Sequence, residues 1–238
     1  MAEMNRLDPI EAAQHFIETH FPSCQGAVLA GSVERGEATD TSDLDIVIFD
    51  ERVKAAYRES LIDFGWPIEV FVHNLTSYKH YFELDLKSAK PSMPRMVLEG
   101  IILKDVGILA AIKREAQEIL DQGPEKWTDE IINTKRYFLT DVLDDFKGGK
   151  DRAEELFIAN ALADLMVEFV LRTNGQWVGT SKWVIRSLRQ FDATFTEAFV
   201  DAFDLFYRTN DKNQVIALCE KILEPYGGRL FDGFSLGK

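Results

Sequence analysis

The sequence has few cysteines and no long apolar run. Of its 238 residues only Cys24 and Cys219 are cysteines, and they form no CxxC pair. Two free thiols in a reducing compartment are therefore expected rather than a disulfide framework. No apolar run reaches the roughly 18 residues that a membrane-spanning helix needs, and residues 1–14 are too polar and acidic for a secretory signal. We expect a soluble, cytoplasmic protein that has no membrane partner.

Positive charge is also scarce. Lysine and arginine number 27 against 40 aspartates and glutamates, so the net charge is −13. This deficit argues against RNA, DNA or an anionic membrane as the main partner, because those surfaces attract basic patches. An acidic protein suits metal ions and cationic small molecules instead. The four histidines show no metal-ligand spacing and are assigned no role.

The first half of the chain alternates strand and helix patterns. Short apolar runs predict strands, amphipathic segments predict helices, and Asp8 followed by Pro9 is typical of a helix start. The predicted strands are 26–30, 43–49, 67–74 and a short extended piece at 101–105, and the predicted helices are 8–21, 51–64 and 77–89.

The second half shows almost no strand pattern. Amphipathic helices are predicted at 108–120, 127–146, 151–173, 180–188, 194–209 and 212–223. A mixed α/β segment followed by an all-helical one predicts two domains. We expect an α/β (α+β) fold in which domain 1–110 contains a mixed sheet with helices and domain 111–238 is an all-α helical bundle.

Two aspartates stand at the start of the second predicted strand. Residues two apart in a strand point to the same face, so Asp43 and Asp45 project together. Such neighbouring carboxylates repel each other unless a cation lies between them. Mg²⁺ prefers this kind of oxygen ligand, and it also takes substrate phosphates.

A phosphate-binding element is predicted just before them. Gly31 and Ser32 end the first strand and are expected to begin a short helix. Glycine allows a phosphate close to the backbone, and the serine hydroxyl and helix amides can donate to it. Arg35, one turn further on, is a candidate contact for the same anion. A third carboxylate, Glu69, lies among apolar residues of strand 67–74, where a charged side chain is costly without a partner.

These residues carry a family resemblance. Gly-Ser, a spacer of about ten residues and Asp-x-Asp resemble the DNA polymerase beta-like nucleotidyltransferase superfamily. The segments "GSVERG", "TSDLDIVIF" and "IEVFV" are most similar to aminoglycoside nucleotidyltransferases of the streptomycin/spectinomycin type. A weaker similarity covers "NGQWVGTSKWVIRSL", where that branch places a lysine on the nucleotide phosphates.

The resemblance implies a nucleotidyltransferase domain followed by a helical substrate-binding domain, and it implies roles for individual residues. Asp43 and Asp45 would bind Mg²⁺, with two ions expected. Glu69 would be a ligand of the second ion or the base for the acceptor hydroxyl. The implied nucleotide-binding residues are Gly31, Ser32, Arg35, Ser42 and Lys182. The reaction would transfer AMP from ATP to a hydroxyl of a small molecule and release pyrophosphate.

The acceptor stays open at this stage. An aminoglycoside-like antibiotic would connect the protein with antibiotic resistance, and acidic residues of the helical half are candidates for a cationic acceptor site, although they also fit ordinary solvated helix faces. These residues are Asp141, Asp144, Asp145, Asp164 and Glu168. The alternatives are modification of a protein or an RNA end, or a catalytically silent nucleotide-binding protein. The sequence gives no indication of the oligomeric state.

Overall fold

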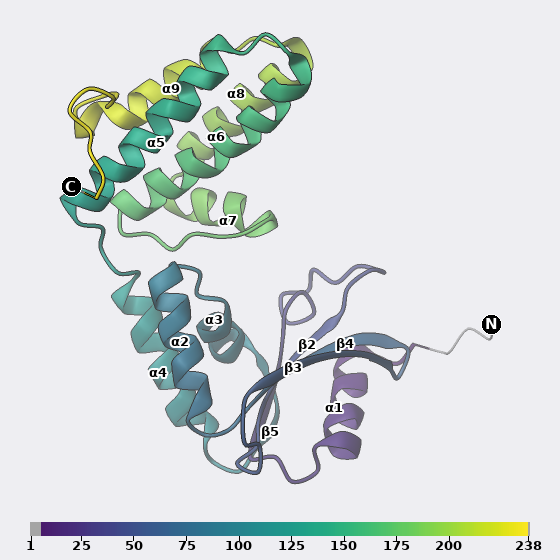
Figure 1. The fold of residues 1–238 in the computed structure, drawn as a ribbon. Coiled ribbons are helices and arrows are strands. Elements are labelled where there is room, and N and C mark those ends of the chain that lie inside the picture. Colours follow the sequence, from purple (N-terminus) through teal and green to yellow (C-terminus); the bar gives the residue numbers. More distant parts are fainter. Residues whose placement is uncertain (1–5, 238) are drawn as a thin grey trace. The chain divides into compact units, whose positions relative to one another are not determined.

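The computed structural model describes residues 6–237 and divides the chain into two compact units. The first unit comprises Met1–Gln122 and the second Gly123–Lys238. Figure 1 shows a sheet with helices in the first unit and helices alone in the second. The α/β fold class predicted from the sequence is confirmed. The division falls after the helix at 109–122, twelve residues beyond the expected domain boundary at 110.

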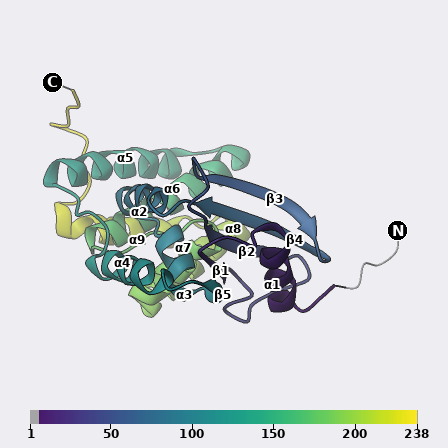
Figure 2. The same ribbon diagram turned by 90° about the horizontal axis from the view of Figure 1, so that it is seen from below.

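The first unit is built on a five-stranded mixed sheet. Its strands are β1 (Gly26–Ala30), β2 (Leu44–Phe49), β3 (Tyr57–Asp63), β4 (Trp66–His73) and β5 (Ile101–Asp105), in the order β3-β4-β2-β1-β5. The pair β2–β4 is parallel, whereas all other neighbours are antiparallel. Figure 2 shows β3 at one edge of this sheet, beside β4.

Helices cover both faces of the sheet, which explains why β1 and, apart from Asp45, β2 consist of apolar residues. Helix α1 (Pro9–His20) packs on one face, against side chains such as Leu29 and Ile46. Helices α2 (Ser77–Ser88), α3 (Ser92–Glu99) and α4 (Leu109–Gln122) pack on the other, against Val28 and Val47. Successive strand residues alternate between these two cores. The side chain of Asp8 caps α1 as the sequence predicts.

The predicted helix at 51–64 is wrong, because its second half is strand β3. Residues Phe64 and Gly65 both have positive φ, 50° and 79°, and join β3 to β4 as a two-residue hairpin loop. Such a loop matches the twist of antiparallel strands, so pairing with β4 replaces the helix. β3 lies mostly exposed at the sheet edge, so no alternating apolar pattern marks it as a strand.

The second unit is a helical bundle. It contains α5 (Asp129–Gly148), α6 (Arg152–Thr173), α7 (Lys182–Phe191), α8 (Ala193–Thr209), α9 (Asn213–Leu223) and the short 3₁₀ turn η1 (Glu224–Tyr226). These helices enclose one apolar cluster that includes Leu143, Met166 and Phe206. The C-terminal residues after η1 return to α5, where the ring of Phe234 stacks on Tyr137 at 3.9 Å between centroids. Within residues 6–237, no helix is both long enough and apolar enough to cross a membrane.

Candidate active site

Three carboxylates from two neighbouring strands come together in the first unit. Asp45 of β2 lies directly opposite Glu69 of β4 in the parallel register, and Asp43 immediately precedes β2. One carboxylate oxygen from each residue lies within 4.8 Å of the other two. The sequence places the two aspartates together by their spacing, and the pairing of β2 with β4 adds Glu69. We call Asp43, Asp45 and Glu69 the carboxylate cluster.

The turn at residues 31–36 borders this cluster. Gly31 has a φ of +84°, and a Cβ atom at this position would collide with Oδ2 of Asp45. Glycine is therefore required both by the backbone conformation and by the close approach of the aspartate. Residues 31–36 form turns, closed by the amide of Glu37 donating to the carbonyl of Ser32, so the short helix expected at Ser32 is absent. Ser32 itself lies partly buried in this turn.

The negative charges around Asp45 are only partly offset by the nearby arginines. Burial raises its pKa, and the negative charges of Asp43 and Glu69 raise it further, to about 6. A carboxylate in this position favours a nearby cation, because a cation offsets both the desolvation and the repulsion. The oxygen donors and their spacing fit a hard divalent ion such as Mg²⁺.

Glu69 differs from Asp45 because two residues of β3 bind it. Arg58 donates from Nε to Oε1 at 2.6 Å and from Nη2 to Oε2 at 2.5 Å. The hydroxyl of Ser60 donates to Oε1 at 3.0 Å. The hydrogen bonds from Arg58 are the main cause that lowers the pKa of Glu69. Sequence reasoning missed both partners because it assigned 51–64 to a helix, and the hairpin loop at Phe64 and Gly65 was the available signal.

The loop that leads into β2 is held by residues outside the cluster. The hydroxyl of Ser42 accepts a hydrogen bond from the amide of Thr39 at 2.8 Å. Ser42, which the sequence predicts to bind the nucleotide, therefore has a structural contact within the loop. Arg6 donates to the carbonyls of Asp40 and Ser42 at 3.1 and 3.0 Å, while its guanidinium lies 3.4 Å from the ring centroid of Trp66. Arg6 therefore connects this loop to the start of β4. No sequence motif predicts this contact.

Arg35, predicted to contact the nucleotide, lies in the turn beside Gly31. Its Nε donates to Glu37 Oε2 at 3.3 Å, and its Nη1 lies 3.9 Å from Glu34 Oε2. The side chain thus has acidic neighbours on its own turn. Its role at an anion stays a prediction.

The remaining predicted residues belong to the second unit. Lys182 is the exposed first residue of α7, and its role at the nucleotide stays a prediction. Of the acidic residues considered for the acceptor, Asp144 forms an ion pair with Arg229, and Glu168 pairs with Lys135 at 2.7 Å. These two carboxylates are therefore already offset by basic partners.

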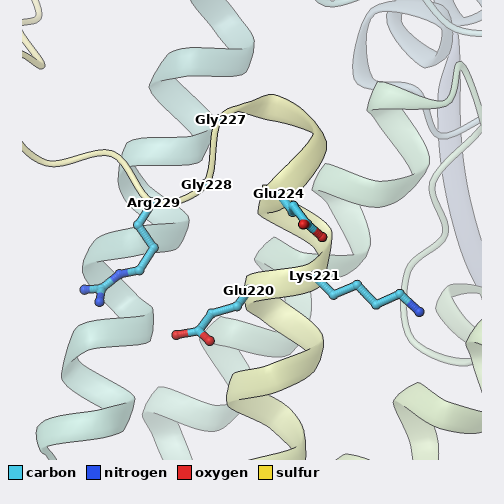
Figure 3. Close-up of a pocket in the computed structure, with 6 residues that line it drawn as sticks. All are labelled: Glu220, Lys221, Glu224, Gly227, Gly228 and Arg229. Carbon is cyan, nitrogen blue, oxygen red and sulfur yellow. The ribbon is translucent and has the colours of Figure 1, made fainter.

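The second unit also contains an open pocket at the end of α9 (Figure 3). Its lining residues are Glu220, Lys221, Glu224, Gly227, Gly228 and Arg229. Glu220 and Arg229 point to the same side of α9, whereas Lys221 points away from it. Glu220 also forms an ion pair with Lys147 at 3.2 Å. None of the predicted site residues lines this pocket, so it gives no support to an active site there.

Comparison with known proteins identifies the family of the chain. Residues 15–170 match the family described as nucleotidyltransferase domain. The chain belongs to this family. The protein is therefore a nucleotidyltransferase, an enzyme that transfers a nucleoside monophosphate. Enzymes of this family usually take a nucleoside triphosphate and a divalent metal, and the matched range contains Asp43, Asp45 and Glu69.

Individual proteins add little to the family match. Among solved structures, a nucleotidyltransferase-like protein from Exiguobacterium sibiricum is similar with a TM-score of 0.48 and 12% sequence identity. That similarity covers 92% of this chain and 75% of the other. No curated protein matches the chain.

Proposed function

We propose that this nucleotidyltransferase uses Mg²⁺ to transfer AMP from ATP to a hydroxyl group of a small molecule. The observation that supports the proposal is the carboxylate cluster, which lies beside a glycine turn where the start of β2 pairs in parallel with β4. Acidic ligands for the metal and a turn that carries the hydroxyl of Ser32 thus occur at one place. Such a pairing suits the handling of a metal-bound triphosphate.

Asp43, Asp45 and Glu69 would hold the metal in this proposal. When bound, Mg²⁺ supplies charge stabilisation at the phosphate oxygens and orients the attacking and leaving groups. Gly31 allows the Asp45 carboxylate to approach the backbone closely, because any side chain at this position would collide with its Oδ2. The hydroxyl of Ser32 would donate to a phosphate oxygen there. The partly enclosed position of Asp45 strengthens its interaction with a cation, because less water screens the charges.

The acceptor is assigned by chemistry rather than by the fold. A net charge of −13 disfavours RNA, which needs a basic surface. It favours a cationic acceptor that carries a hydroxyl, and aminoglycosides are one such class. We propose them as the first acceptors to test, together with Lys182 as a contact to the triphosphate.

Pyrophosphate release tests this function. The full chain is incubated with Mg²⁺, each nucleoside triphosphate in turn, and a panel of aminoglycosides that includes streptomycin and spectinomycin. We expect release with ATP and one acceptor, and a loss of at least about 100-fold on Asp45→Asn, as for the removal of a group that stabilises the transition state electrostatically. Asp201→Asn, an exposed aspartate of α8, is the matched control and should retain activity.

Two results would change the proposal in different ways. Full activity of Asp45→Asn would show that the carboxylate cluster is not the catalytic site. ATP binding that depends on Mg²⁺ and Asp45, without turnover for any aminoglycoside, would keep the site and reject this acceptor class. The search would then move to metabolites, proteins and RNA ends.

A further inference from the structure

The strongest feature outside the family motif is the contact between Glu69 and strand β3. β3 pairs with β4 in an antiparallel register in which Ser60 lies directly opposite Glu69 and Arg58 opposite Phe71. Arg58 reaches Glu69 as a diagonal cross-strand neighbour, a distance that long side chains span. Its guanidinium carbon also lies 5.0 Å from the ring centroid of Phe71. The hairpin therefore presents two donors to one carboxylate from fixed positions.

The three hydrogen bonds occupy most of the lone-pair sites on the Glu69 carboxylate. An ionised carboxylate has about four lone-pair sites, two on each oxygen. Oε1 accepts from Nε of Arg58 and from Oγ of Ser60, which fills both of its sites. Among residues 6–237, Oε2 accepts only from Nη2 of Arg58. One lone pair, on Oε2, remains for another partner.

We propose that Arg58 and Ser60 are positioning residues that fix Glu69 as a ligand binding the metal through a single oxygen. The inference rests on the proposed function, because it takes the carboxylate cluster as the metal site. The fork of Arg58 sets the orientation of the carboxylate, and Ser60 blocks Oε1. Glu69 is then presented to Asp43 and Asp45 through Oε2, and the carboxylate does not have to be ordered when the ion arrives.

The role of Arg58 depends on its shape rather than only on its charge. A guanidinium can donate two parallel hydrogen bonds to a carboxylate, whereas an ammonium acts as a point charge. Arg58→Lys therefore keeps the charge beside the cluster and removes the fork. This choice separates positioning from electrostatics, because loss of the positive charge alone would strengthen cation binding.

The test is a titration of the full chain with Mn²⁺ alone, in which the electron paramagnetic resonance signal of the free ion gives the dissociation constant. We expect Arg58→Lys to weaken binding about 10-fold, as is typical for residues that orient metal ligands. Ser60→Ala removes one hydrogen bond, donated by a neutral hydroxyl, and should weaken binding roughly threefold. Glu59→Gln, an exposed change on the same strand that faces the other side, is the control and should bind as the parent does.

A double-mutant cycle with Glu69→Gln shows whether Arg58 acts through Glu69. We expect Arg58→Lys to cause no further loss once Glu69 is replaced, a result that a merely structural role of Arg58 would not produce. An equal loss in both backgrounds, or binding by Arg58→Lys within twofold of the parent, would overturn the proposal. Thermal denaturation checks that each variant folds. If Arg58→Lys does not fold, the Mn²⁺ affinity of Ser60→Ala decides between the two outcomes.

Failure of the metal site itself gives a different pattern. If Asp45→Asn binds Mn²⁺ as tightly as the parent, or if the parent binds none, the carboxylate cluster is rejected as the metal site. The positioning role then falls with it. If Asp45→Asn abolishes binding while Arg58→Lys leaves it unchanged, only the role of Arg58 is rejected.

Discussion

At the scale of single residues, the members of the carboxylate cluster differ in what offsets their charge. Arg58 and Ser60 donate hydrogen bonds to Glu69, whereas Asp45 is partly enclosed and faces the negative charges of Asp43 and Glu69. Folding therefore makes Asp45 harder to ionise. At neutral pH and without a metal, the ionised Asp45 side chain destabilises the folded protein. The same environment favours cation binding, so a bound metal would offset this cost.

We predict that Asp45→Asn stabilises the metal-free protein at pH 7. The pKa of Asp45 rises on folding from 3.8 to about 6, so the stability linked to its protonation is present below the lower value and lost as the pH rises through the upper one. A shift of this size corresponds to at most about 3 kcal/mol in the free energy of unfolding. Urea unfolding in the presence of a chelator measures the difference between variant and parent.

The pH dependence provides the control for this prediction. The advantage of Asp45→Asn should shrink as the pH falls, and it should vanish near pH 4, where the parent side chain is protonated in the folded state. Added Mg²⁺ should reverse the order at pH 7 by stabilising only the parent. A variant that is less stable than the parent at pH 7 without metal would contradict the raised pKa of Asp45.

At the scale of elements, the turn at 31–36 shows how local backbone geometry makes room for the Asp45 carboxylate. Gly31 and Gly36 both have positive φ, +84° and +67°, so alanine is strained at either position. Only Gly31 has a neighbour that a Cβ would meet, namely the carboxylate of Asp45. The two glycines therefore form a matched pair that separates backbone strain from collision with the cluster.

We predict that Gly36→Ala lowers the free energy of unfolding by about 1 kcal/mol and leaves Mn²⁺ binding unchanged. Gly31→Ala should cost more than this, and it should also weaken Mn²⁺ binding, because Asp45 has to move away from the added methyl group. Urea unfolding and Mn²⁺ titration of both variants measure the two effects. Equal Mn²⁺ affinities for the two variants would show that Gly31 has no role beyond its backbone conformation.

The elements also show what the sequence could and could not predict. The apolar runs of β1 and β2 reflect coverage on both faces, and β4 is apolar at the alternate residues that pack into the core under α1, so the predicted positions of these three strands are confirmed. β3 gave no such pattern, because an edge strand that is mostly exposed needs only its hydrogen bonds to β4 and a suitable turn. The helix predicted at 51–64 therefore rests on local periodicity alone, which gives no information about the strand that pairs with this segment.

The same reason explains which residues of the candidate site could be predicted from the sequence. The motif spacing was enough to bring Asp43 and Asp45 together, because it needs only the alternation of one strand. Glu69 required the parallel pairing of β2 with β4, which the sequence suggested but did not fix. Arg58 and Ser60 required the hairpin and were missed. Contacts that depend on more pairings of distant segments were thus harder to predict.

At the scale of the whole molecule, each unit has a core of its own. The first unit contains two apolar clusters, one on each face of its sheet, and the second contains a single cluster enclosed by helices. We predict that the two units unfold in separate transitions. The metal binds only the folded first unit in our proposal, so Mg²⁺ should raise the midpoint of one transition alone.

The tryptophans allow this prediction to be tested in the full chain. Of the four, Trp66 alone belongs to the first unit, whereas Trp127, Trp177 and Trp183 belong to the second. Fluorescence of Trp66→Phe therefore reports the second unit, while calorimetry reports both. At 100 times the dissociation constant, Mg²⁺ should add about 2.7 kcal/mol to the stability of the first unit. We expect this increase in calorimetry of the parent and no shift in the fluorescence of Trp66→Phe. A single transition that moves with Mg²⁺ in both measurements would show that the two units unfold together, because a metal bound to one unit would then stabilise the core of the other.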